Sequence, residues 1–385
     1  MKSDFSLAAV VFLGALFLSS ILILKIYRYN NLSAPAGFGC ASAEICYARA
    51  NEWSLPKGAL VFKTGGYDGQ FYYYLAASIF SDRKAVLDSD SFRRSRIGYP
   101  LLGSLFYSPG PESLLIALFV LPVFFHALAI FALGRLSSSL WPALAYAINP
   151  LSLLGSSLML ADGLACSMFL CAVWLADAKH KRSFFYTLLS FLFAAFAVLT
   201  KETMAVPVFA LGTGSLVSFL RKEGSYSKAI FWGFSLLPAF FWFWMTGFFS
   251  ASAAKAGIPF SGVVEYLRNP DAFFSGRNFL VLFLLMVAFF TARSFYLFFA
   301  RKEKGTVFFL FAFALLFTGF AGSEYWSNFA NISRLFFPVL PALALQKERG
   351  FPEKLPFYFF LLFSWIVFRA DMFSRLLESG IWPFK

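Results

Sequence analysis

Long apolar runs alternate with short polar segments along most of the chain, and this pattern sets the predicted fold. The first run, from about Phe5 to Leu24, has about 20 residues, which is enough to cross a bilayer. Further runs lie near Ser113–Leu136, Ser138–Leu158, Asp162–Ala176, Ser183–Leu199, Met204–Leu220, Ala229–Ser250, Phe279–Ala300, Thr306–Gly322, Leu335–Leu345 and Leu355–Phe368. We predict an all-α, polytopic transmembrane protein of about eleven spans, in which residues 1–385 form a single integral membrane domain.

One long loop, residues 29–112, interrupts this alternation, and loops of that length are usually functional. It contains Asp68 between glycines, followed after Gln70 by the aromatic run Phe71–Tyr74. Glycines let the backbone turn sharply and approach a ligand closely, whereas aromatic side chains are favoured at the lipid–water boundary. The loop sequence alone therefore leaves open a binding site around Asp68 or a turn followed by an interfacial anchor.

Composition and charge narrow the class of protein. Of the 385 residues 59% are hydrophobic and 14% are charged, so lipid must solvate much of the surface. The net charge of +13 is spread over small basic clusters between apolar runs, which is typical of the cytoplasmic loops of a membrane protein and gives no reason to expect nucleic acid.

The basic clusters fall in alternate connections and so predict the orientation. They contain Arg135, Lys179, Lys181, Arg182, Arg221, Lys222, Lys228, Arg301, Lys302, Lys304, Lys347, Arg349 and Lys354. If these face the cytoplasm, the long loop faces outward together with Asp162, Lys201, Glu202 and Arg334. Charges at a membrane boundary usually face a water-filled cavity or a partner. The bland alternatives are a helix N-cap for Asp162, a solvated pair for Lys201 and Glu202, and a snorkelling side chain for Arg334.

A second basic cluster, Arg93, Arg94 and Arg96, lies in the long loop before Tyr99. Arginine forks match phosphate oxygens in a two-pronged way. The apolar stretch Leu101–Tyr107 that follows is too short to cross a bilayer and is expected in the interface. The cluster predicts a phosphate held at the membrane surface, or simple docking to anionic headgroups.

Cysteines and histidines give no metal-binding pattern. Cys40 and Cys46 would form a disulfide if the loop faces an oxidising compartment, whereas Cys166 and Cys171 lie in an apolar run. The two histidines, at 126 and 180, have no partner histidine nearby. We predict no cofactor, since a divalent metal would have only Asp162 to support it.

Several segments resemble a known group of proteins. The stretches Tyr67–Tyr73 and Arg93–Leu102 look like the first outer loop of bacterial polytopic proteins related to the GT-C glycosyltransferases, and GPI mannosyltransferases contain a similar Trp-Asp-Gly segment. Leu199–Thr203 and Ser333–Pro341 resemble later segments of that group. Many relatives carry an acidic pair near the start of the fourth span, where this chain has only Asp162.

The resemblance implies a GT-C fold, with interfacial helices in the first outer loop, in the bacterial inner membrane. It also implies inverting sugar transfer, on the periplasmic side, from a polyprenyl-phosphate donor to a glycan, lipid or protein acceptor. Asp68 is then the candidate general base. Candidate phosphate-binding residues are Arg93, Arg94, Arg96, Lys201 and Arg334, and candidate cavity or acceptor residues are Tyr67, Gln70, Tyr99, Asp162 and Glu202.

Two other classes of protein remain as alternatives. A transporter or a flippase for lipid-linked glycans would use the same charges as a pathway, but the sequence has no convincing internal repeat, and its charges gather at one predicted face, not at the midplane. A membrane O-acyltransferase commonly uses a histidine base, and neither His126 nor His180 is expected near the outward-facing charges.

Overall fold

The computed structural model describes residues 2–253, with short gaps at 43, 64–65, 109, 138–139, 150–151, 154, 156–157 and 178–183, and then 258, 260–268 and scattered positions between 288 and 319. This described part is mostly helical and contains no β-strand, so the predicted all-α class is confirmed for it. Arg334 lies outside the described residues, and of the last four predicted spans at most scattered positions are described.

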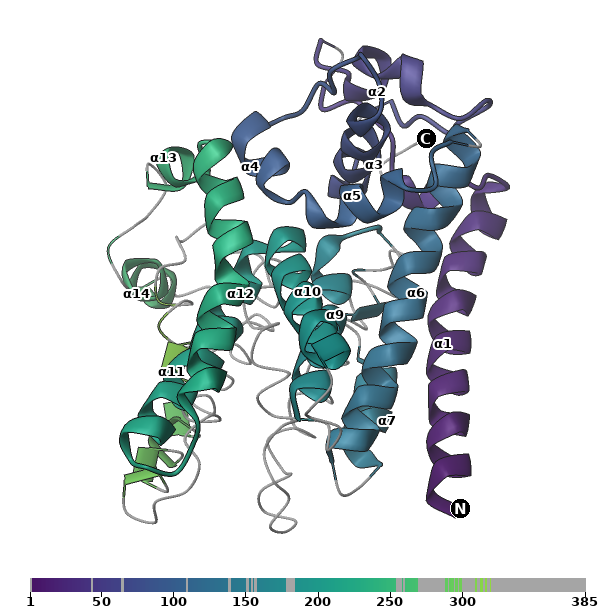
Figure 1. Ribbon diagram of the computed structural model, residues 1–385. Coiled ribbons are helices and arrows are strands. Elements are labelled where there is room, and N and C mark those ends of the chain that lie inside the picture. The colour runs from purple at the N-terminus through teal and green to yellow at the C-terminus, as the bar shows by residue number, and fades with distance from the viewer. Residues whose placement is uncertain are drawn as a thin grey trace.

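A bundle of long helices makes up the body of the molecule (Figure 1). Its members are α1 (Lys2–Tyr29), α6 (Pro111–Leu136), α7 (Trp141–Ala147), α9 (Ala161–Asp177), α10 (Phe184–Thr200), α11 (Ala205–Leu220) and α12 (Tyr226–Met245). Helix α9 packs on α6 and α10, while α1 packs on α6 and α7. Small buried residues such as Ala165 and Ala172 of α9 and Ala194 and Ala197 of α10 allow close helix approach.

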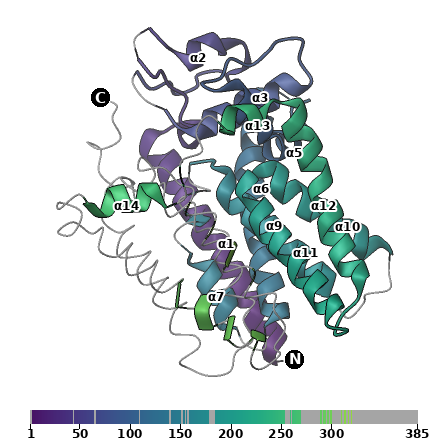
Figure 2. The same cartoon turned by 90° about the vertical axis from the view of Figure 1, so that its left-hand side faces the viewer.

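Four segments are long and apolar enough to cross a membrane: Phe5–Tyr29, Pro111–Leu136, Glu202–Leu220 and Tyr226–Met245. Helices α9 and α10 are apolar but shorter. In the view of Figure 2, turned by 90°, α9 to α12 stand side by side. The pattern of apolar runs therefore located these helices correctly, whereas the total number of spans stays a prediction.

Two predicted spans differ from the structure. The run Ser138–Leu158 is not one helix, because α7 already ends at Ala147, and Asn149 precedes a proline, which disfavours helical backbone. Helix α12 ends at Met245, before the predicted end at 250, because Gly247 adopts a left-handed φ of 69°. The chain then turns into the short helix α13 (Phe248–Ala253), and α14 (Ser261–Arg268) follows.

The long loop folds into short helices that cover one end of the bundle, which we call the loop-bearing end (Figure 1). They are η1 (Ala34–Ala36), α2 (Tyr47–Ala50), η2 (Glu52–Ser54), α3 (Asp68–Ile79), α4 (Asp90–Ser95) and α5 (Gly98–Ser104). The aromatic run Phe71–Tyr74 of α3 is buried, with at most 5% of any residue exposed. These rings therefore form part of the core of the loop, and their burial counts against the alternative of an interfacial anchor.

Helix α5 lies between the ends of α10 and α6. Gly98 of α5 meets Thr200 at the end of α10, and the Tyr99 hydroxyl donates a hydrogen bond to the carbonyl of Leu118, well inside α6. The side chains of Leu105 and Phe106, just after α5, are exposed. This arrangement fits the short apolar segment that the sequence predicted for the membrane interface.

Gly98→Ala is expected to destabilise the protein. A Cβ at this position would lie 2.5 Å from the Thr200 Oγ1 atom and 2.7 Å from the Thr200 amide nitrogen, so α5 would have to move away from α10. Such overpacking costs about 1–3 kcal/mol, which a lower midpoint of thermal unfolding in detergent would report. Gly233→Ala in α12 is the matched control, because no atom lies within 4 Å of its added Cβ. Equal midpoints for the two variants would contradict the close approach of α5.

Candidate active site

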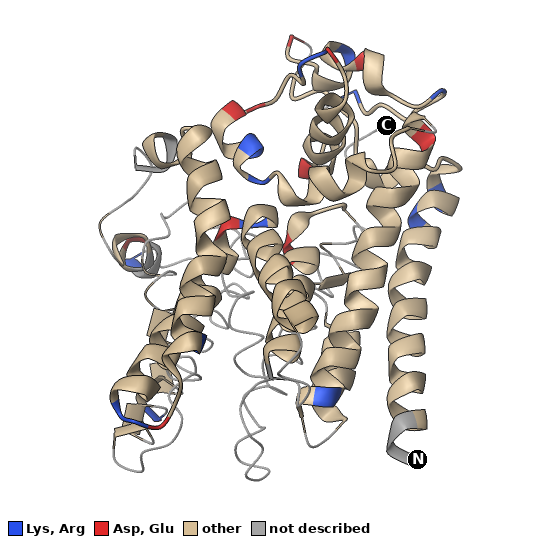
Figure 3. Cartoon of the chain, in the orientation of Figure 1, with Lys and Arg blue, Asp and Glu red and all other residues tan. Residues whose placement is uncertain are grey.

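Charged residues lie mainly at the two ends of the bundle, and the middle of the long helices contains few of them (Figure 3). At the loop-bearing end, acidic and basic side chains from the loop meet others from the bundle. The ion pairs there join Asp68, Asp88, Arg93, Arg96, Asp162, Lys201 and Glu202, which we call the junction network. It contains every charged candidate site residue that the structure describes, with the exception of Arg94.

Arg93 links the start of α3 to the start of α4. Its Nη2 atom lies 3.0 Å from the Asp68 Oδ1 atom, and its Nη2 and Nε atoms lie 2.7 and 2.8 Å from the two oxygens of Asp88. Burial acts to lower the pKa of this guanidinium, but the hydrogen bond to Asp88 and the charge of Asp68 outweigh it and hold the pKa above its usual value. Arg93 therefore stays charged beside Asp68.

Asp68 is the first residue of α3, where the helix dipole also favours a carboxylate. Its side chain is 29% exposed, whereas that of Arg93 is 7% exposed. The carboxylate of Asp68 is thus partly open to solvent, whereas the guanidinium of Arg93 is almost fully buried.

Arg96 joins the loop to the bundle. Its Nε and Nη2 atoms each lie 2.7 Å from an oxygen of Glu202, which follows α10, so the pair is bidentate. Burial acts to lower the pKa of Arg96, but the charge of Glu202 outweighs it and holds the pKa above its usual value. Lys201 and Asp162 form a further ion pair at this end. Its Nζ–Oδ1 distance is 3.3 Å, and both side chains are almost fully buried.

These contacts settle two of the alternatives left by the sequence. Lys201 and Glu202 are not a solvated pair, because each binds a partner from another segment. Asp162 is not the N-cap of α9, because the helix already begins at Ala161. Both acidic residues and Lys201 face the protein interior at the loop-bearing end.

Tyr72 is a residue that the sequence argument missed. Its hydroxyl accepts a hydrogen bond from Arg96 Nη1 at 3.4 Å. Burial raises the pKa of this phenol, and among the nearby charges Arg96 and Arg93 lower the pKa while Asp68 and Asp162 raise it. The hydroxyl therefore stays protonated and lies near Arg96, Arg93, Asp68 and Asp162. Its position four residues after Asp68, on one face of a helix, was the available signal.

Arg94 is the one predicted phosphate-binding residue of the loop that stays apart. Arg93 and Arg96 each bind a carboxylate of the junction network, whereas Arg94 binds elsewhere. Its Nε lies 2.9 Å from Asp90, on the surface. Its carbonyl accepts a hydrogen bond from Trp242 Nε1 of α12 at 2.8 Å, which fixes α4 to the bundle.

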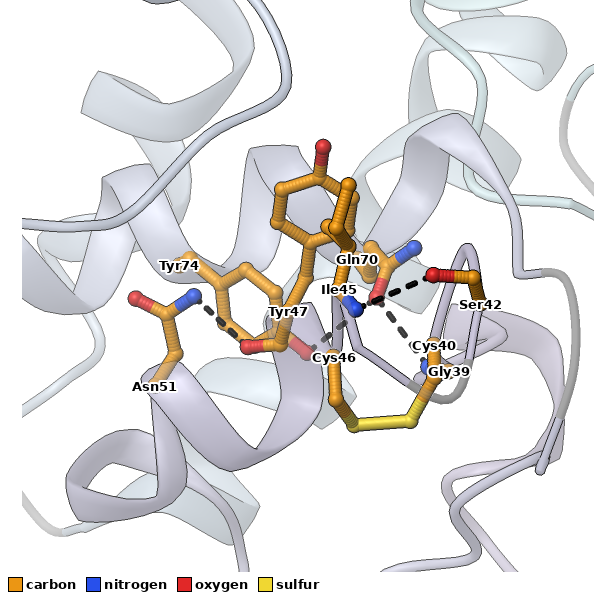
Figure 4. Close-up of a disulfide and its surroundings, with 9 residues drawn as sticks. All are labelled: Gly39, Cys40, Ser42, Ile45, Cys46, Tyr47, Asn51, Gln70 and Tyr74. Carbon is orange, nitrogen blue, oxygen red and sulfur yellow. Dashed lines mark hydrogen bonds between the residues drawn. A yellow bond between two sulfur atoms is a disulfide. The ribbon is translucent and has the colours of Figure 1, made fainter.

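The other three predicted cavity residues are packing residues in this structure. Gln70 is buried, and its Oε1 atom accepts from the Gly39 amide at 3.1 Å (Figure 4). The Tyr67 ring lies 4.9 Å from the Lys25 ammonium. Tyr99 is fully buried and bound to α6, as described above.

Two buried donors in this region have no hydrogen-bond acceptor among the described residues. They are Arg93 Nη1 and the Thr203 hydroxyl, the latter in the residue after Glu202. Unsatisfied buried donors are costly, so they indicate either an acceptor oxygen from a ligand or one from a part of the chain that is not described.

No metal-ligand set appears in the described ranges, where no three His, Cys, Asp or Glu side chains come together. His126 lies within α6, with its Nε2 atom 3.4 Å from the Ala147 carbonyl and its ring stacked on Tyr146. Cys166 and Cys171 are buried free thiols. These three residues thus lie among the bundle helices and not in the junction network.

Comparison with protein-family models and with curated proteins gives no match for this chain.

Proposed function

We propose that the chain is a GT-C-type membrane glycosyltransferase that moves a sugar from a polyprenyl phosphate to an acceptor at the loop-bearing end. The observation that carries this proposal is the junction network itself. It places a part-exposed carboxylate, Asp68, in front of buried cations at the end of a bundle of apolar helices. A lipid-linked donor needs that combination, because its phosphate lies at the membrane surface while its tail stays in hydrocarbon.

Asp68 acts in this proposal as the general base. It takes the proton of an acceptor hydroxyl, whose oxygen forms a bond to the anomeric carbon as the bond from that carbon to the phosphate oxygen breaks. The polyprenyl phosphate leaves as a stable anion, so no second carboxylate has to protonate it. Attack opposite to the leaving group inverts the configuration at the anomeric carbon.

Arg93 and Lys201 are the cations proposed to stabilise the leaving phosphate, together with Arg334. Arg93 is favoured because its Nη1 atom has no acceptor among the described residues. Arg96 has a different role, because its Nε and Nη2 atoms bind the two oxygens of Glu202 and hold the loop on the bundle. Glu202 and Asp162 are proposed to shape the cavity around the acceptor.

The proposal also includes about eleven spans and a site that faces the periplasm from the bacterial inner membrane. It includes residues 29–112 as the first outer loop, a glycan, lipid or protein as the acceptor, and no cofactor. The basic clusters between apolar runs support this orientation.

A donor-class assay tests the proposed function. Purified protein in liposomes receives synthetic polyprenyl-phosphate sugars or nucleotide sugars, with a mixed glycan and lipid extract as acceptor, and sugar transfer is measured by mass spectrometry. We expect products only with the lipid-linked donors, because only these place a phosphate at the end of an apolar bundle. Transbilayer movement of the lipid-linked sugar without transfer would support the flippase alternative and overturn the proposal, as would transfer from nucleotide sugars alone.

A further inference from the structure

A disulfide-closed segment lies against the helix that begins with Asp68. Cys40 and Cys46 form the disulfide, which confirms the pairing that the sequence left open (Figure 4). Both cysteines are partly exposed, and the residues between them that are described are exposed. Cys166 and Cys171 are buried in α9, already reduced. A soluble thiol reagent would therefore act on the loop.

The residues on either side of the disulfide-closed segment Cys40–Cys46 contact the first turns of α3. The amide of Gly39, next to Cys40, donates to Gln70 Oε1 at 3.1 Å, and the Tyr74 hydroxyl donates to the same oxygen at 3.3 Å. The ring of Phe38 lies 5.0 Å from that of Tyr73. Past the disulfide, the ring of Tyr47 lies 5.1 Å from that of Phe71. Figure 4 shows Gln70 reaching Gly39 beside the disulfide.

The stretch that leads up to Cys40 also binds the residue before Asp68. The Tyr67 amide donates to the carbonyl of Gly37 at 3.1 Å. Asp68 therefore stands between two points, Tyr67 and Gln70, that are both fixed to a strand-like stretch ending at Cys40. The stretch is held in turn by the hydrogen bonds between Phe62 and its neighbours Phe38 and Cys40.

We propose that the Cys40–Cys46 disulfide is a redox-sensitive positioning element for Asp68, and that Gln70 is the positioning residue through which it acts. A dithiol reagent attacks one sulfur, the S–S bond breaks, and the reagent leaves as a cyclic disulfide while Cys40 and Cys46 become thiols. The segment next to Gly39 then loses its closure, and the first turn of α3 loosens. The effect on turnover rests on the proposed function, whereas the effect on α3 does not.

Hydrogen exchange of the full-length protein in detergent tests the structural part. Reduction with dithiothreitol is expected to speed amide exchange in residues 70–74 by about tenfold, the effect of losing one buried hydrogen bond on local opening. Exchange in α6 and α12 should not change. The variant Cys40→Ser/Cys46→Ser should exchange as the reduced protein does and should not respond to the reagent. Unchanged exchange in residues 70–74 after reduction would overturn the proposal.

A Gln70 variant supplies a second test. Gln70→Leu removes both hydrogen bonds at the side-chain oxygen and should raise exchange in α3 as reduction does. In the donor-class assay, Gln70→Leu and reduction should lower kcat about tenfold and leave the KM for the donor unchanged. Exchange that responds in a protein without transferase activity would refute only the proposed function. A kcat that resists both changes would refute only the positioning role.

Discussion

Asp68→Asn is expected to lower the rate of sugar transfer by about 10²- to 10⁴-fold, the usual contribution of a positioned general base. The asparagine keeps the size of the side chain but cannot take the proton of the acceptor hydroxyl. Because Arg93 retains Asp88, with donor–acceptor distances of 2.7 and 2.8 Å, the fold around α4 should survive the change. The measurement is kcat in proteoliposomes, with the midpoint of thermal unfolding as the check on folding.

Asp88→Asn is the matched control for that experiment. Its side chain is 33% exposed against 29% for Asp68, and both carboxylates pair with Arg93. If Asp68 serves only to hold Arg93, the two variants should lose similar amounts of activity. The proposed mechanism instead predicts that Asp88→Asn stays within about tenfold of the wild type, because that change removes only hydrogen bonds to the arginine. Similar losses of activity in both variants would contradict the assignment of Asp68 as the general base.

Arg96→Met is expected to have the largest effect on stability, at about 3–5 kcal/mol of unfolding free energy. The change leaves Glu202 at the junction of loop and bundle without its bidentate partner, and only 16% of the Glu202 side chain is exposed. An unpaired charge in such a place is costly, and the methionine cannot compensate it. Chemical denaturation in detergent, followed by the fluorescence of the tryptophans, would report the change.

The double variant Arg96→Met/Glu202→Gln separates this penalty from lost packing. It removes the unpaired charge, so we expect it to be more stable than Arg96→Met alone, as is usual when both members of a buried pair are replaced. A double variant whose loss equals the sum of the two single losses would indicate that the two residues do not interact.

The positions of the helices could be predicted from the sequence, because few structures other than a helix suit an apolar run of bilayer length. The starts of α6 and α9 and the end of α10 came out close to the predicted boundaries, and these put Asp162 and Lys201 at one end of the bundle. The break after α7 was not predicted. The sequence stays largely apolar past Ala147, although the helix ends there.

The ion-pair partners within the site could not be predicted from the sequence. The sequence named Arg93 and Arg96 as equivalent phosphate binders, yet one pairs with Asp68 and the other with Glu202, which is 106 residues away along the chain. Such partners depend on how α5 packs against α10, and no local pattern encodes that. The role of the aromatic run stayed open for a related reason, because rings suited to an interface are equally suited to a buried core.

The most direct test of the central claim is a structure determined with a non-hydrolysable polyprenyl-phosphate sugar bound. The account predicts the phosphate oxygens within about 3 Å of Arg93 Nη1 and the anomeric carbon on the side of the Asp68 carboxylate. A phosphate bound at the opposite end of the bundle, or an Asp68 carboxylate turned away from the bound sugar, would contradict it.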